Sequence, residues 1–367
     1  MKKNLAPRRR LLAVVLCGSA LLAACGGSDD DASGGDDSSE KSSTTTTIDP
    51  ATERPQGEWT IVSYDVGRSD GPPDYAKGNA SVRLVTYEPT CDSGPCTIKV
   101  LPGEDGTFLP PGEPRLEGQD YTGTPYEMTW DEASGSYTYL SEPEVVSCTN
   151  TDGETIEGGY TSTTERRYTF RPPTEDAPAG LFGDRIETNE PTEAGVAKGC
   201  TPFTSTQRTA GTPTGEATAD APALAGDYAT SWTVEKDESD SGDAPLPVGY
   251  AGLLGTWKLA GDGAELQLTA TAAQPFPLTA AGQTWSGSLA GATEECTAEG
   301  GNEALGLWDL TESVTDLTPV ALTEDGLPIL NGKWAYSATP QPDARANMCE
   351  QASQAAMVTM VPAAALD

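Results

Sequence analysis

Histidine is absent from all 367 residues of the chain. Ser-His-Asp and Cys-His catalytic arrangements are therefore excluded, and so are the usual histidine-ligated zinc and copper sites. A Ser-Lys hydrolase would need a Ser-x-x-Lys pair on an ordered element. The one pair of this kind, Ser38 and Lys41, lies in a segment with almost no apolar side chains. We therefore predict no catalytic residue, no metal ligand and no cofactor.

Basic residues are scarce, with 22 Lys and Arg against 56 Asp and Glu and a formal net charge of −34. Five of the bases lie in the first ten residues, so 17 remain in the rest of the chain. Binding of nucleic acid depends on neutralising phosphates with Lys and Arg, so no nucleic-acid partner is expected. The acidic surface keeps the protein soluble. Among so many carboxylates a close pair is expected by chance, so a glycan hydrolase stays an alternative only.

Long apolar runs are also lacking, apart from residues 11–24, "LLAVVLCGSALLAA", which follow the basic "MKKNLAPRRR". This run is short for a membrane span and is typical of a signal peptide. It ends in "LAAC", which resembles the lipobox of bacterial lipoproteins. The resemblance implies that residues 1–24 are removed and that Cys25 carries the lipid, palmitate included. An ordinary secretory signal with a chance cysteine is the alternative.

Residues 25–55 consist mainly of Gly, Ser, Asp and Thr. They cannot bury enough apolar surface to offset the entropy of ordering, so we predict a disordered tether. A single acyl chain anchors a protein only weakly, so stable attachment needs the several chains that the lipoprotein resemblance implies. The expected location is the outer face of the cytoplasmic membrane, with the membrane as a partner through the lipid anchor.

The remaining cysteines reveal an internal repeat. Six cysteines follow Cys25, and two pairs of them have nearly equal spacing, 148 to 200 and 296 to 349. The opening strands also match, "GEWTIVSYDV" from residue 57 and "GDYATSWTVEK" from residue 226. We therefore predict two copies of one domain, residues 56–212 and 224–367, joined by a linker at 213–223.

A duplicated fold places equivalent cysteines together, which predicts the disulfides Cys148–Cys200 and Cys296–Cys349 in an oxidising compartment. Cys91 and Cys96 have no counterpart in the second copy and are left to pair with each other across the turn of "TCDSGPCTIKV".

Alternating apolar residues predict strands throughout both copies, as in "ASVRLVTYEP", with Val82, Leu84 and Thr86 on one face, and "RRYTFRP", with Tyr168 and Phe170. Only residues 349–360 have a composition that suits a helix, and a final strand is the alternative there. We predict an all-β chain of two tandem homologous antiparallel β domains, each a small barrel or sandwich, with a lipocalin-like barrel among the alternatives.

The segment "YEPTCDSGPCTIKV", with "GEWTIVSYDV" before it and "SGSYTYL" after it, resembles the repeated extracytoplasmic β modules of actinobacterial lipoproteins and of some receptor-type Ser/Thr kinase ectodomains. This resemblance implies a secreted or surface β domain without known catalysis or an established ligand. Its motifs are structural, so no functional residue is carried over from it.

Tryptophans on predicted strands are the remaining candidates for binding. They would line an apolar cavity if a barrel interior were partly open, and a filled core is the alternative. The five candidates are Trp59, Trp130, Trp257, Trp285 and Trp334. We therefore expect a non-enzymatic, surface-anchored lipoprotein that binds an apolar small molecule or an envelope component. A passive envelope, adhesion or protein-interaction role is one alternative, and the carboxylate-dependent glycan hydrolase is another.

Overall fold

The computed structural model describes residues 54–69, 77–92, 94–103, 124–150, 153–239, 246, 249–261, 265–297, 304–346 and 349–367. These residues all belong to the compact unit Ile48–Asp367. The predicted signal peptide, most of the predicted tether and the lipidation residue Cys25 lie outside the described residues. Within the described part of the chain, every helix is too short or too polar to cross a membrane.

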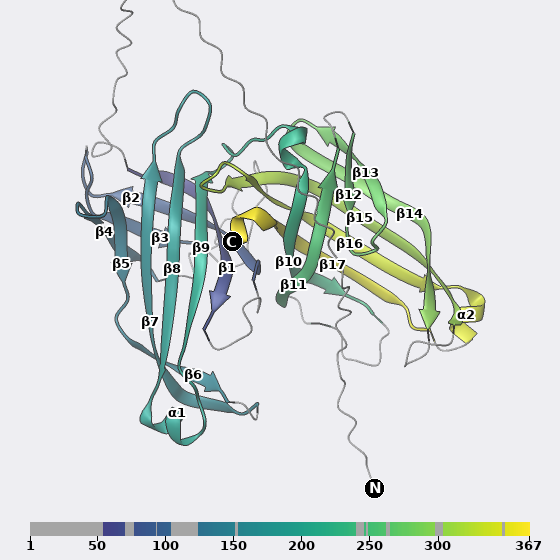
Figure 1. The fold of residues 1–367 in the computed structure, drawn as a ribbon, viewed down its shortest axis with the longest axis horizontal. Coiled ribbons are helices and arrows are strands. Elements are labelled where there is room, and N and C mark those ends of the chain that lie inside the picture. Colours follow the sequence, from purple (N-terminus) through teal and green to yellow (C-terminus); the bar gives the residue numbers. More distant parts are fainter. Residues whose placement is uncertain are drawn as a thin grey trace, which may run out of the picture. The chain divides into compact units, whose positions relative to one another are not determined.

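The first sheet closes into an antiparallel barrel, one of the two architectures that the sequence predicts for this half of the chain (Figure 1). Its strands follow the order β5-β4-β3-β2-β1-β9-β8-β7-β6, and β5 also pairs with β7. The long strand β7 pairs with β6 through its first part and with β5 through its second part, so eight strands close and β6 continues past them. We call this closed set barrel 1. Its elements are β1 (Gly57–Arg68), β2 (Ala80–Pro89), β3 (Ile98–Pro102), β4 (Tyr126–Asp131), β5 (Ser136–Leu140), β6 (Glu144–Thr149), β7 (Thr155–Arg171), β8 (Gly180–Pro191), α1 (Glu193–Ala197) and β9 (Phe203–Pro213).

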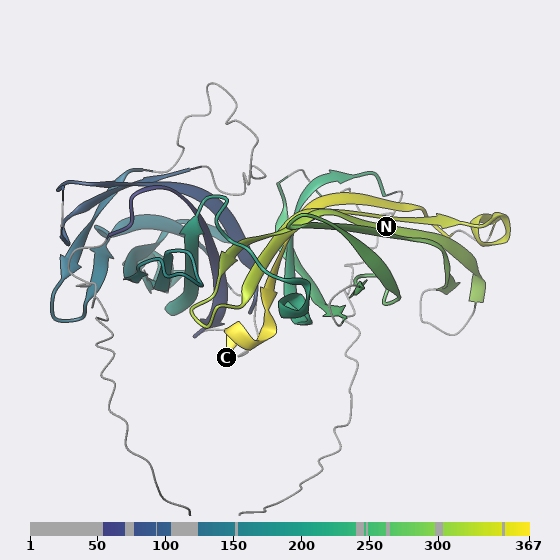
Figure 2. The same cartoon turned by 90° about the horizontal axis from the view of Figure 1, so that it is seen from above.

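The second sheet is a closed antiparallel barrel of eight strands, β10 to β17 in chain order, which we call barrel 2 (Figure 2). The single strand β14 takes the place that β5 and β6 share in barrel 1, and α2 precedes the last strand as α1 does. The elements are the 3-10 turn Ala221–Leu224, β10 (Gly226–Asp237), β11 (Ala251–Ala260), β12 (Leu266–Thr269), β13 (Pro275–Ala281), β14 (Thr284–Thr297), β15 (Ala304–Leu322), β16 (Pro328–Pro340), α2 (Pro342–Ala346), β17 (Ala352–Pro362) and the 3-10 turn Ala363–Leu366.

Matching hydrogen bonds support the repeat at atomic detail. In barrel 1 the Tyr160 hydroxyl donates to the carbonyl oxygen of Thr201 at 2.8 Å. In barrel 2 the indole nitrogen of Trp308 donates to the carbonyl oxygen of Glu350 at 3.1 Å. Each acceptor is the residue directly after the second long-range cysteine of its copy. The two sheets thus keep the same bond with a different aromatic donor.

All three predicted disulfides are present: Cys91–Cys96, Cys148–Cys200 and Cys296–Cys349. The two long-range bridges have nearly equal Cα–Cα distances of 6.3 and 6.4 Å. Each bridge joins the end of a strand to the residues that follow a short helix. Cys148–Cys200 joins β6 to the connection between α1 and β9, and Cys296–Cys349 joins β14 to the connection between α2 and β17. The bridges therefore fasten equivalent places in the two copies.

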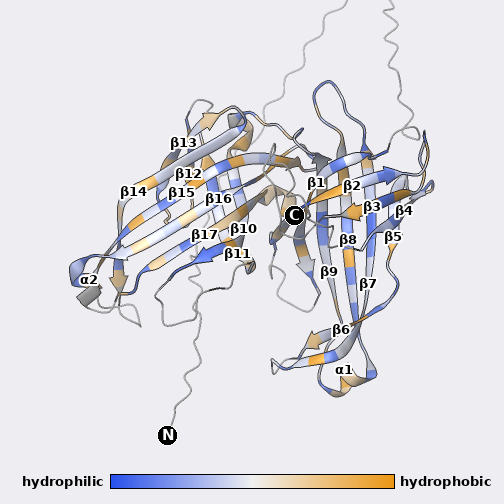
Figure 3. Cartoon of the chain, turned by 180° about the vertical axis from the view of Figure 1, so that it is seen from behind, coloured by the Kyte–Doolittle hydropathy of each residue, from blue (hydrophilic) through white to orange (hydrophobic). Residues whose placement is uncertain are grey.

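Apolar and polar residues alternate along the strands, as the colouring of Figure 3 shows. Barrel 2 contains a large buried core that includes Trp257, Phe276, Trp285 and Trp334. Barrel 1 has a smaller apolar core around Trp59. A third cluster contains residues of both barrels, namely Val62, Tyr64, Val82, Phe182, Ala210, Ala229, Val320, Ala321, Ile329, Val361, Ala365 and Leu366. Part of the outer surface of each barrel is therefore buried.

Candidate functional site

The five candidate tryptophans do not form one group. Trp59 is buried and Trp130 is half-buried, and both pack in the core of barrel 1. Trp257, Trp285 and Trp334 are each at most 3% exposed and belong to the core of barrel 2. There Trp257 lies 6.3 Å from Trp334, centroid to centroid. The tryptophans of barrel 2 are packed side chains of a largely apolar interior, in which the indole nitrogen of Trp334 donates to the buried Glu312.

The inner face of barrel 1 carries three arginines, Arg83, Arg166 and Arg185, which we call the arginine cluster. Arg83 pairs across the strands with Ile61, whose side chain belongs to the apolar core. Arg166 pairs with Arg185 on one side and with Tyr139 on the other. Directly opposed residues of neighbouring strands point to the same face of a sheet, so all three arginines point inward.

Tyrosine rings surround Arg166. Its guanidinium carbon lies 4.4 Å from the ring centroid of Tyr126 and 5.5 Å from that of Tyr139. These distances fit cation–π contacts, which gain strength where water is displaced. Burial raises the pKa of Tyr126 to about 12, so this ring stays neutral at physiological pH. Tyr126 therefore offers an aromatic face and a hydroxyl group without negative charge.

Arg185 belongs to a polar chain that crosses three strands. It donates to Gln207 Oε1 at 3.1 Å and to Glu187 Oε2 at 3.3 Å. Gln207 in turn donates to Asp65 Oδ1 at 2.9 Å. Burial lowers the pKa of Arg185, the charge of Arg166 lowers it further, and Glu187 raises it. Burial raises the pKa of Asp65, against the opposing effect of its hydrogen bond from Gln207.

Barrel 2 has an apolar pair at the corresponding positions. Arg185 and Trp334 each lie fifteen residues before the second long-range cysteine, at 200 and 349. Arg166 pairs with Arg185 in barrel 1, and Val314 pairs with Trp334 in barrel 2. Val314 is 0% and Trp334 2% exposed, whereas the side chain of Arg185 is 24% exposed. Solvent therefore reaches the inner face of barrel 1 at Arg185, whereas the equivalent position in barrel 2 is filled by Trp334.

Two buried donors in the arginine cluster are unused. Within the part of the chain that the structure describes, the Nε atoms of Arg166 and Arg185 are buried and have no hydrogen-bond acceptor. Buried polar groups are nearly always hydrogen-bonded, because an unmade bond costs the full desolvation of the group. The inner face of barrel 1 can therefore accept an additional group that carries hydrogen-bond acceptors.

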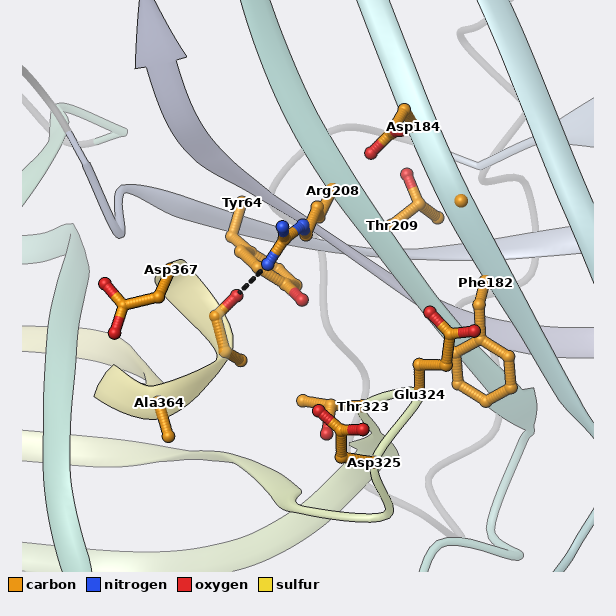
Figure 4. Close-up of a pocket in the computed structure, with 12 residues that line it drawn as sticks. Tyr64, Phe182, Asp184, Arg208, Thr209, Thr323, Glu324, Asp325, Ala364 and Asp367 are labelled. Atoms are coloured by element: carbon orange, nitrogen blue, oxygen red, sulfur yellow. Dashed lines mark hydrogen bonds between the residues drawn. The ribbon is translucent and has the colours of Figure 1, made fainter. Parts of the chain in front are cut away.

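A pocket of about 400 Å³ has residues of both barrels in its wall (Figure 4). Arg208 donates to the carbonyl oxygen of Ala365 at 2.7 Å, the bond that Figure 4 marks. Burial raises the pKa of Tyr64 to about 12, while Arg208 acts in the opposite direction. The other charged groups in the wall are acidic: Asp184, Glu324, Asp325 and Asp367. This pocket repels anions, and its one arginine already contacts the other barrel.

Comparison with known proteins yields nothing similar: no protein family, no curated protein and no solved structure matches this chain. The resemblance to actinobacterial lipoprotein modules therefore stays a prediction. Among the described residues, no group of three or more Cys, Asp or Glu side chains is arranged to hold a metal ion.

Sequence reasoning missed the arginine cluster, although it assigned β7 correctly as a strand. The signal was present in "RRYTFRP", because Arg166 lies two residues before the inward-facing Tyr168 and therefore shares its face. Arg167 points away from that face, and its side chain is 59% exposed. A charged residue that continues an otherwise aromatic inward stripe could have marked the site.

Proposed function

We propose that this protein is a lipid-anchored, non-enzymatic, extracytoplasmic binding protein that takes a small molecule at the inner face of barrel 1. Barrel 2 is the filled partner domain. The observation that carries the proposal is a contrast between equivalent positions of the two barrels. In barrel 1 they hold the accessible pair Arg166 and Arg185, whereas in barrel 2 they hold the buried pair Val314 and Trp334.

The energetic cost of the arginine cluster supports a functional role. Like charges held together in a partly desolvated interior repel one another, and each lost hydration shell costs free energy. An apolar pair of similar volume is often as stable or more stable, and barrel 2 has an apolar pair at these positions. Positions that break the packing rules of a fold are where functional sites are expected.

The apolar ligand expected from the tryptophans is refined by this site. The apolar core of barrel 1 directly adjoins the arginine cluster, since Tyr168 follows Arg166 on the same face of β7. A ligand at the cluster would therefore contact charged groups at one end and aromatic side chains at the other. The proposed ligand is amphipathic rather than purely apolar.

Native mass spectrometry tests the binding. The mature chain, purified from its own host in a mild detergent, is expected to carry a reproducible mass adduct of a few hundred daltons, because small-molecule sites in proteins usually take drug-sized molecules. A spectrum that contains only the mass of the lipidated chain, in repeated preparations, would argue against a resident ligand.

The anchor is a separate part of the proposal. The three disulfides support an oxidising compartment outside the cytoplasm. The "LAAC" sequence and the acidic segment after it support lipidation at Cys25.

Cys25→Ala should move the protein from the membrane fraction to the medium, since the charge of the chain gives it no affinity for anionic lipids. The measurement is immunoblotting of both fractions, with Cys91→Ala as the control that keeps the anchor. Retention of Cys25→Ala on the membrane would contradict lipidation there.

A further inference from the structure

We infer that the ligand of barrel 1 is a small organic anion with a planar apolar body. Its acidic group would lie against Arg166 and Arg185, and its body against the tyrosine rings beside them. This inference rests on the proposed function, because it names the chemical class of the molecule that binds at the same inner face.

The local charge favours an anion although the chain as a whole repels one. Arg166 and Arg185 each supply a positive charge here, and the carboxylates in the hydrogen-bonded chain of Arg185 are Glu187 and Asp65. Burial raises the pKa of Asp65, which favours the neutral form of this carboxyl group. The remaining surface of a chain with net charge −34 disfavours nonspecific binding of anions. Anion binding by this protein therefore requires the arginine cluster.

The available donors suit an oxyanion. Arg185 uses both terminal nitrogens, for Gln207 and Glu187, and its Nε has no acceptor. The guanidinium carbon of Arg166 lies 4.4 Å from the ring centroid of Tyr126, and its Nε has no acceptor. Guanidinium edges bind carboxylate, sulfonate or phosphate oxygens through strong, charge-assisted hydrogen bonds.

The aromatic surroundings point to an organic rather than an inorganic anion. The rings of Tyr126 and Tyr139 lie 4.5 Å apart between centroids at a tilted angle of 46°, and both contact Arg166. Tyr168 extends this aromatic surface into the apolar core. A planar organic body would add to these ring contacts, whereas an inorganic ion would not. The ligand class is therefore an aromatic or otherwise planar carboxylate, sulfonate or phosphate ester.

A matched pair of fluorescent probes tests the inference on the mature full chain. The anion is 8-anilinonaphthalene-1-sulfonate, and N-phenyl-1-naphthylamine has the same aromatic body without the sulfonate. We expect the wild type to bind the sulfonate at least about tenfold more tightly than the neutral probe, since one charge-assisted hydrogen bond accounts for a factor of this size. Arg166→Gln and Arg185→Gln should each remove most of this preference, because each takes one guanidinium from the proposed site.

Arg167→Gln is the matched control, because it removes the same charge from the next residue, on the outer face of β7. It should keep the full preference. If circular dichroism shows that Arg166→Gln does not fold, Arg185→Gln alone tests the inference, since the Arg185 side chain is partly exposed and its replacement disturbs the fold less. Equal affinity of the wild type for both probes would overturn the anion inference and leave the proposed function standing. Failure of the wild type to bind either probe would count against both.

Discussion

Replacing Cys148 and Cys200 together by Ala is expected to lower the free energy of unfolding of barrel 1 by about 4 kcal/mol. The same double substitution at Cys296 and Cys349 is expected to cost barrel 2 about as much. The two bridges close loops of 52 and 53 residues. In the chain-entropy model the loss depends on loop length alone, so two loops of equal length give equal effects.

The third disulfide is the internal control. Cys91–Cys96 closes a loop of only 5 residues, and its removal should cost about 2 kcal/mol in the same model. Calorimetry of the three double variants measures the effect, with each transition assigned to a barrel by hydrogen exchange, because a chain of two domains need not unfold in one step. For a barrel of this size, about 4 kcal/mol corresponds to a fall in Tm of roughly 10 °C. A larger loss for the short bridge than for either long one would contradict the model.

Glu312→Ala is expected to lower the stability of barrel 2 by about 3 kcal/mol, because it leaves buried donors without an acceptor. The Glu312 side chain is 1% exposed and accepts three hydrogen bonds. Two come from the backbone nitrogens of Thr271 and Ala272, at 3.0 and 2.9 Å, and one comes from the indole nitrogen of Trp334, at 2.8 Å. The carboxylate therefore fastens the turn between β12 and β13 to the interior of the barrel.

Urea unfolding of Glu312→Ala measures this cost, with Glu295→Ala as the control. Glu295 lies on the neighbouring strand β14 and is exposed, so its removal should change stability by less than about 0.5 kcal/mol. Glu312→Gln keeps the size of the side chain but replaces one acceptor oxygen by a donor. Its free energy of unfolding should therefore lie between those of Glu312→Ala and Glu295→Ala. Equal stability of Glu312→Ala and Glu295→Ala would show that the three hydrogen bonds contribute little.

The repeat, the strands and the disulfides could be predicted because they depend on regularities along the chain. Equal cysteine spacing in two copies implied equivalent bridges, and all three pairs are present. Residues 349–360 were ambiguous by composition alone. They lie largely within the strand β17, because β10 and β16 supply pairing partners on both sides. Helix propensity is a weak preference that such tertiary contacts override.

The inward and outward faces could not be assigned from alternation. Val82 and Leu84 share a buried face, as predicted, but Val82 packs in the cluster that contains residues of both barrels. Arg83, between them, faces the interior. Both faces of β2 are partly buried, so hydrophobic alternation does not say which one is inside. The contact between Arg166 and Arg185 depends in addition on the register of β7 against β8, which no local pattern specifies.

The central claim is that barrel 1 holds the ligand and barrel 2 does not. The most direct test is to record native mass spectra of the wild type, Arg166→Gln and Arg167→Gln, all purified from the host in the same way. The account predicts an adduct on the wild type and on Arg167→Gln, and its loss from Arg166→Gln, because Arg166 belongs to the inner face of barrel 1 and Arg167 does not. An adduct of equal abundance on all three proteins would place the ligand elsewhere and contradict the account.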